Sequence, residues 1–145
     1  MAEVIEPPDP VAVVVDYLTT RLADDPDTDR VAVADSLPTA RRGHEPAREA
    51  VVVLATGGTP RDVIVDDAQI TVTSWAGTPG DGARAHAIGR RVHAYMRAAE
   101  RVGVMGTTPC TSVQAVSLPY DDPDPITGRA RVSATYILSL RGRVI

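Results

Sequence analysis

A glycine-rich stretch, Gly57-Gly58-Thr59-Pro60, is the first place where residue types and their order could serve ligand chemistry. Such a stretch cradles phosphates when it continues into a Gly-Lys-Ser/Thr ending and a helix start. This chain contains no lysine, because all 15 of its basic residues are arginine, and no helix start follows the stretch. The pattern therefore favours a hairpin turn over a phosphate-binding loop.

Three aspartates, Asp121, Asp122 and Asp124, offer carboxylate oxygens of the kind that hard cations prefer. Prolines interrupt the three acids, and the glycine and final glutamate of a calcium-binding loop are missing. The pattern is more typical of a solvent-exposed connection within a hairpin.

The histidines and the cysteine are poorly spaced for joint chemistry. His86 and His93 lie seven residues apart, which is roughly 10.5 Å along a helix axis, and neither belongs to a His-Glu-x-x-His pattern. Cys110 is the only cysteine, so no intrachain disulfide forms, and it is typical of a small buried apolar residue. We therefore expect a protein that is not an enzyme and needs no cofactor or metal ion.

The length and composition are those of one globular domain spanning residues 1–145. Apolar residues make up 43% and charged residues 23% of the chain, enough for a hydrophobic core. Aromatic residues make up 3%, too few for the stacking platforms of single-strand nucleic-acid binders. Residues 1–10 carry acids and prolines where a signal peptide has basic and apolar residues, so we expect the protein to stay in a cytoplasm.

The charge of the chain is unevenly distributed. The net charge is −4, but residues 1–29 contain eight acids and one arginine, while residues 129–145 contain four arginines and no acid. Such a dipolar chain suits head-to-tail contacts between copies.

Two helices are predicted. Asp9-Pro10 has the types of an N-cap and a first helical position, and apolar residues then recur at helical spacing until Asp24-Asp25-Pro26. A longer helix is predicted over residues 83–102, with Gly103 where a C-terminal glycine belongs.

The longer helix carries a predicted basic stripe. Its residues step by three or four: His86, Arg90, His93, Arg97 and Arg101. Three interpretations stay open for the stripe, namely a solvated helix face, a contact with an acidic protein surface and a contact with nucleic acid.

The other apolar or alternating segments predict strands at 30–34, 51–55, 62–65, 69–75, 111–118 and 130–140. The segment 51–55 is apolar throughout, which predicts a central strand buried on both faces. Strands and helices are segregated along the chain, so we predict an α+β fold with a mainly antiparallel sheet packed against two helices. The polar segments 35–49 and 119–129 are long for loops, and we expect partners to order them.

Several of these segments together carry a family resemblance. They are Asp9-Pro10-Val11, residues 51–58, residues 70–76, the Ala- and Arg-rich helix 83–102, and residues 122–129 before the strand that ends in Arg141-Gly142. Trp75-Ala76 before the helix and the Asp-Pro-x-Thr-Gly hairpin before the last strand are the most telling parts. In this order they resemble the tail terminator, or tail-completion, proteins of siphophages, especially those infecting actinobacteria, over nearly the whole chain.

The resemblance implies a structural virion protein that forms a homohexameric ring at the head–tail interface. Such a ring caps the tail tube, ends tube polymerisation and presents the surface that joins the head. The implied partners are copies of the chain itself, the tail tube protein and head–tail connector proteins of the neck. Genomic DNA is expected to pass through the lumen without specific binding, no membrane is involved, and assembly takes place in the host cytoplasm.

A ring needs two different complementary patches on each copy, and charged residues are the sequence's candidates for them. We expect some of the following to lie at subunit or tail-tube boundaries: Arg90, Arg97, Arg101, Arg131, Arg141, Asp121, Asp122 and Asp124.

Three alternatives stay open. The first is another neck component, a head-to-tail connector or stopper. The second is a small cytosolic enzyme or ligand-binding domain with Asp62, Asp66, His86 or Cys110 in a cleft. The third is a nucleic-acid-binding module that uses the basic stripe, which the overall acidity and the few aromatic residues disfavour.

Overall fold

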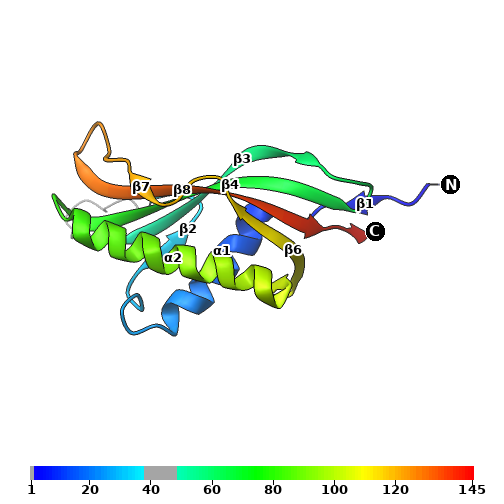
Figure 1. Cartoon of the computed structure of the whole chain (residues 1–145), viewed down its shortest axis with the longest axis horizontal. Coiled ribbons are helices and arrows are strands. Elements are labelled where there is room, and N and C mark those ends of the chain that lie inside the picture. The colour runs from blue at the N-terminus through cyan, green and yellow to red at the C-terminus, as the bar shows by residue number, and fades with distance from the viewer. Residues whose placement is uncertain (1, 38–48) are drawn as a thin grey trace.

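The computed structural model, in which residues 2–37 and 49–145 are described, has the predicted α+β architecture (Figure 1). Both helices lie on the same side of a curled, mainly antiparallel sheet. The helices are α1 (Pro10–Ala23) and α2 (Gly82–Val102). The strands are β1 (Ile5–Glu6), β2 (Ala32–Ala34), β3 (Ala50–Pro60), β4 (Val65–Pro79), β5 (Val104–Met105), β6 (Thr108–Ala115), β7 (Tyr120–Asp121), β8 (Arg129–Arg141) and β9 (Arg143–Val144).

The main sheet has the strand order β2-β3-β4-β8-β6-β5, and the short β7 also pairs with β8. All of these pairings are antiparallel except that of β2 with β3, which is parallel. Strands β1 and β9 form a separate two-stranded ribbon that joins the two ends of the described chain. This ribbon and the parallel pairing of β2 were not predicted.

The helix ends follow the sequence signals. The Asp9 carboxylate accepts hydrogen bonds from the backbone N–H of Val11 at 3.0 Å and of Ala12 at 3.2 Å, with Pro10 as the first residue of α1. Helix α2 ends at Gly103, whose φ of 84° lies in the left-handed region that favours glycine. Both predicted helices are confirmed to within a residue or two.

The hydrophobic core lies between the helices and one face of the sheet. Alternate residues of β4 and β8 point into it, among them Ile70 and Tyr136, and meet Leu18 of α1 and Ile88 of α2. Burying one such large apolar side chain contributes about 1.5–3 kcal/mol. Packing against the helices therefore holds the sheet in place.

The prediction that residues 51–55 form the central strand is wrong. Strand β3 lies second from the edge, and the middle of the sheet is formed by β4 and β8. The segment is apolar because its two faces have different partners: Val51 and Val53 face the core, whereas Val52 packs against Trp75 on the opposite face. Leu54 is already 48% exposed, so burial on both faces ends there.

The predicted turn at residues 57–60 is also wrong, because these residues continue β3 and pair with β4 after a bulge. Gly58 has a φ of 119°, and a Cβ at this position would lie 2.2 Å from the carbonyl oxygen of Asp67, so the bulge requires glycine. The turn follows at Asp62, whose carboxylate accepts hydrogen bonds from the N–H groups of Ile64 and Val65 at 2.9 and 2.8 Å. The segments 62–65 and 69–75 are not two strands, because β4 runs through Asp66 and Asp67 without a break.

The two long loops have different outcomes. Of the segment 35–49, residues 38–48 lie outside the described residues. The segment 119–129 folds against its own chain, contrary to the expectation that a partner orders it. Besides the pairing of β7 with β8, the backbone N–H groups of Asp122 and Asp124 donate to the carbonyls of Arg131 and Arg129, both at 3.0 Å.

Neither helix in the described part of the chain is both long and apolar enough to cross a lipid bilayer.

Candidate assembly surfaces

The predicted basic stripe divides into an outer and an inner part. Arg90, Arg97 and Arg101 are exposed and form no ion pair with any described residue. His86 and His93 instead turn toward the sheet. The arginines alone therefore form a surface that is open to an external partner, and we call these three residues the arginine stripe.

The two histidines hold α2 against the strands. His86 Nε2 lies 2.5 Å from Asp121 Oδ1 of β7, and His93 Nδ1 lies 2.7 Å from the hydroxyl of Tyr136 in β8. Burial, with a smaller contribution from the nearby charge of Arg97, lowers the pKa of His93 below its usual value. Burial also raises the pKa of Tyr136, so this pair is neutral and structural at physiological pH.

Arginines on the other side of α2 neutralise acids of the N-terminal region. Arg91 contacts Asp25 and Asp27, and the Tyr95 hydroxyl donates to Asp25 at 2.8 Å. The hydrogen bond from Arg91 is the main reason why the pKa of Asp25 is lowered. Part of the acidic charge of residues 1–29 is therefore paired within the same copy.

The acidic hairpin formed by residues 120–129 has one highly exposed carboxylate. Asp122 accepts a hydrogen bond from Ser133 at 2.9 Å and lies 3.6 Å from Arg131, and Asp124 accepts one from Thr127 at 2.5 Å, which lowers the pKa of Asp124. Asp121, by contrast, is 74% exposed and contacts only a histidine among the charged groups of the described chain. Asp121 is thus the best placed of the three acids to meet another molecule.

Arg131 is the one predicted interface arginine that is already engaged. Its Nε donates to the backbone carbonyl of Asp122, and its guanidinium lies 5.0 Å from the centre of the Trp75 ring. Arg129 lies over the same ring at 4.9 Å and donates to the carbonyl of Ala76. Both residues act within the chain here, and a contact of Arg131 with another subunit stays a prediction.

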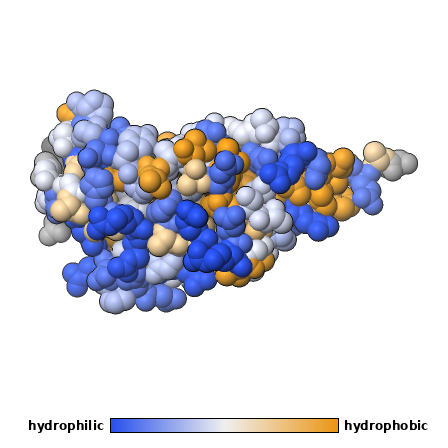
Figure 2. Space-filling view, viewed as in Figure 1, coloured by the Kyte–Doolittle hydropathy of each residue, from blue (hydrophilic) through white to orange (hydrophobic). Residues whose placement is uncertain are grey.

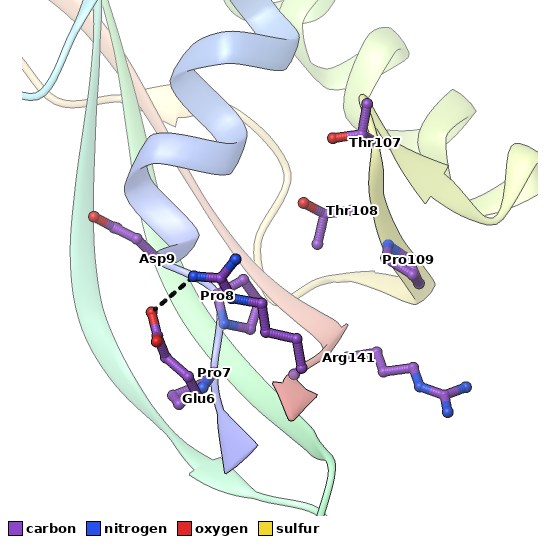
Figure 3. Close-up of a pocket in the computed structure, with 10 residues that line it drawn as sticks. Glu6, Pro7, Pro8, Asp9, Thr107, Thr108, Pro109 and Arg141 are labelled. Atoms are coloured by element: carbon purple, nitrogen blue, oxygen red, sulfur yellow. Dashed lines mark ion pairs between the residues drawn. The ribbon is translucent and has the colours of Figure 1, made fainter. Parts of the chain in front are cut away.

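The ends of the described chain meet at a pocket of about 550 Å³ (Figure 3). It is lined by residues 6–9, the turn at residues 107–109 and residues 141–143. Glu6 and Arg143 pair across the terminal ribbon at 3.7 Å. Arg141 extends away from Glu6 and Asp9 and forms no ion pair with a described residue.

The face of the sheet opposite the helices is rich in hydroxyl groups, a feature that was not predicted. Thr71 and Thr135 lie 3.1 Å apart through their hydroxyls, as do Thr73 and Ser133. Both pairs are direct cross-strand neighbours in the register of β4 and β8. The alternation of polar residues along the two strands indicates such a face, but the cross-strand hydroxyl pairs can be recognised only from the register of β4 and β8.

Two groups of exposed aliphatic and aromatic residues were also missed. The first consists of Val4, Val63, Val144 and Ile145, which we call the terminal knob. The second consists of Val116, Leu118 and Tyr120, which we call the β6–β7 segment. Figure 2 shows hydrophobic side chains at the end of the molecule where the chain termini lie and others near its middle.

The terminal knob is one continuous structure, although it comes from three parts of the chain. The β3–β4 turn that contains Val63 is tied to the C-terminal strand by the hydrogen bond from the Gly142 N–H to the Ile64 carbonyl at 2.7 Å. The Ile145 N–H donates to the carbonyl of Val4 at 3.0 Å across the β1–β9 ribbon. Exposed apolar residues gathered in this way mark interaction sites.

The residues considered for an enzyme lie on separate elements. Asp62 is in the β3–β4 turn, Asp66 is in β4, His86 is in the first turns of α2, and Cys110 is buried in β6, where burial raises its thiol pKa. Within the described residues, no three or more His, Cys, Asp or Glu side chains gather in a way that could hold a metal ion. No protein-family model and no curated protein sequence matches the chain.

Proposed function

We propose that the chain is a siphophage tail terminator, a structural subunit that forms a ring at the end of the tail tube. The α+β fold, with two helices on one side of a mainly antiparallel sheet, is compatible with this assignment. The segments that carry the resemblance include Trp75 before α2 and the hairpin before β8.

One observation carries the proposal: different kinds of exposed surface lie in different parts of an elongated molecule. The arginine stripe lies along α2, the exposed Asp121 lies on β7, and the terminal knob lies at the end with the termini (Figure 1). A ring requires two different patches on each copy, because every subunit meets its two neighbours through opposite sides. A monomeric protein has no such need.

The charge of such a ring suits the passage of DNA. Six copies at −4 each give a ring of −24, which repels phosphates along a lumen. The half-buried hydroxyls of Thr71 and Thr135 add neutral polar groups to the sheet face opposite the helices, whereas Thr73 and Ser133 on the same face are buried. A tight, salt-sensitive complex of the purified ring with duplex DNA would contradict this part of the proposal.

The proposal is tested with tail tubes isolated from the phage or polymerised from its tube protein. The purified chain is added during polymerisation, and tube lengths and tube ends are measured by negative-stain electron microscopy. A terminator shortens the tubes and appears as a cap at one end. Unchanged tubes with bare ends would overturn the assignment, and binding to mature heads instead of tubes would indicate a connector or stopper.

A further inference from the structure

We propose that the terminal knob of one copy docks on the β6–β7 segment of a second copy, and that this contact joins neighbours in the ring. The inference rests on the proposed function and adds to it the two surfaces that form the subunit interface. Neither surface was predicted as apolar from the sequence.

Both surfaces expose several large apolar side chains to solvent. Val63 is 86% exposed at the tip of the β3–β4 turn, and Val144 and Ile145 are 54% and 68% exposed at the C-terminal end of the ribbon. Leu118 is 69% exposed, with Val116 and Tyr120 exposed on either side of it. Isolated exposed apolar residues are ordinary, but three or four gathered on an ordered segment are typical of a contact site.

The two surfaces lie too far apart for one copy to join them. Strand β7, to which the β6–β7 segment leads, lies in one half of the long molecule, and the terminal ribbon forms the opposite end (Figure 1). The knob of one copy must therefore meet the segment of a different copy. Contacts of this head-to-tail kind form a closed ring when the rotation between neighbours closes.

One pair of charges beside these surfaces is complementary. Arg141 precedes the knob residues of the C-terminal strand and forms no ion pair with a described residue. Asp121 directly follows Tyr120 and is paired with a histidine, not an arginine. Of the other charged residues near the knob, Glu6 pairs with Arg143 and Asp62 accepts two backbone N–H groups, whereas Glu3 is exposed and forms no ion pair with a described residue.

The apolar contact supplies the affinity and the charge pair sets the orientation. An exposed ion pair contributes little by itself, whereas burying several aliphatic side chains is the dominant favourable term in association. An arginine beside one surface and an aspartate beside the other also disfavour contacts between two knobs or two segments, since like charges would then meet. A second copy is thus the occupant that matches each surface.

The test uses three variants at exposed sites: Val63→Asp in the knob, Leu118→Asp in the segment, and Leu54→Asp as a matched control. Leu54 is 48% exposed in β3 and belongs to neither surface. Self-association is measured by sedimentation velocity, with tail tubes present if the free chain is monomeric. We expect each of the first two variants to associate at least tenfold more weakly, and the control to match the wild type.

Mixing the first two variants tests the direction of the contact. Each copy of Leu118→Asp retains an unaltered terminal knob, and each copy of Val63→Asp retains an unaltered β6–β7 segment. An equimolar mixture should therefore form a one-to-one dimer that does not grow into larger oligomers. Circular dichroism and the melting temperature check that each variant is folded.

Cross-linking supplies a second readout that does not depend on weakening the contact. The double variant Val63→Cys, Leu118→Cys should form a ladder of disulfide-linked oligomers under mild oxidation, while native Cys110 is buried and does not react. Rings that assemble without cross-links, and with both Asp variants incorporated, would overturn this interface but leave the proposed function standing. A wild-type chain that stays monomeric with tubes present would contradict both.

Discussion

The two faces of strands β4 and β8 differ in what they contribute. The face toward the helices carries Ile70, Val72, Tyr136 and Leu138, all buried in one apolar cluster. The opposite face presents paired hydroxyls in the same register. The helix-covered side of the sheet therefore holds the main core, whereas the opposite side combines a smaller buried cluster around Trp75 with the half-buried hydroxyls of Thr71 and Thr135.

We expect the largest loss in the free energy of unfolding from truncating a side chain in the core. Leu138→Ala removes a fully buried side chain between sheet and helices, and we expect it to lower the free energy of unfolding by about 3 kcal/mol. Thr135→Ala removes a hydroxyl on the opposite face of β8 and should lower the free energy of unfolding by less than ~1 kcal/mol. Urea denaturation measures the free energy of unfolding of both variants, and equal decreases would contradict a larger contribution of the helix-covered face to stability.

The hydroxyl pairs on the face opposite the helices are expected to stabilise the sheet less than the core does. Thr73→Val keeps the shape of the side chain but removes the hydroxyl that lies 3.1 Å from Ser133. We expect a loss of about 1 kcal/mol, because Ser133 keeps its bond to Asp122. A double-mutant cycle with Ser133→Ala isolates the pair, and a coupling energy of zero would show that the hydroxyls do not act together.

Substitutions on the two sides of α2 should affect different properties: those on one side assembly, and those on the other side stability. Arg97→Glu combined with Arg101→Glu reverses two exposed charges that have no partner among the described residues, so we expect weaker ring or tube binding. The free energy of unfolding should fall by no more than about 1 kcal/mol, because Arg101 lies in the last turn of α2, where the helix dipole disfavours a carboxylate. Arg91→Glu places a carboxylate beside Asp25 and Asp27 and should lower the melting temperature instead. Normal rings in the double variant would exclude the arginine stripe from assembly.

The smallest expected effect is a pH dependence from His93. Its pKa is lowered in the folded state by burial, so the unfolded chain binds the proton first as the pH falls below about 6.5. Stability should therefore decrease from pH 7.5 to pH 5.5, and His93→Gln should remove that part of the decrease. His86→Gln serves as the comparison, and an identical pH profile for the wild type and His93→Gln would exclude this role.

Local signals predicted the helices and the fold class. The Asp9 cap, the helical spacing of apolar residues and Gly103 act within a few residues of the chain, so they could be recognised in the sequence. The position of β3 could not be recognised, because Val52 is apolar for its contact with Trp75, which lies far away in sequence. In sequence, the apolar segment 51–55 cannot be distinguished from a strand that is covered by helices on both faces.

The surfaces were predicted only in part for a similar reason. Helical spacing predicted a basic stripe of five residues, of which Arg90, Arg97 and Arg101 are exposed while His86 and His93 turn toward the sheet. The terminal knob combines residues from the N-terminal strand, a turn and the C-terminal strand, so no single stretch of sequence reveals it. The engagement of Arg131 with Trp75 depends on the β4–β8 register in the same way.

The decisive measurement is the mass of the chain in solution, together with negative-stain images in the presence and absence of tail tubes. A tail terminator forms a ring, or is a monomer that becomes a ring when tube ends are supplied. A chain that stays monomeric and leaves tube ends bare would contradict it.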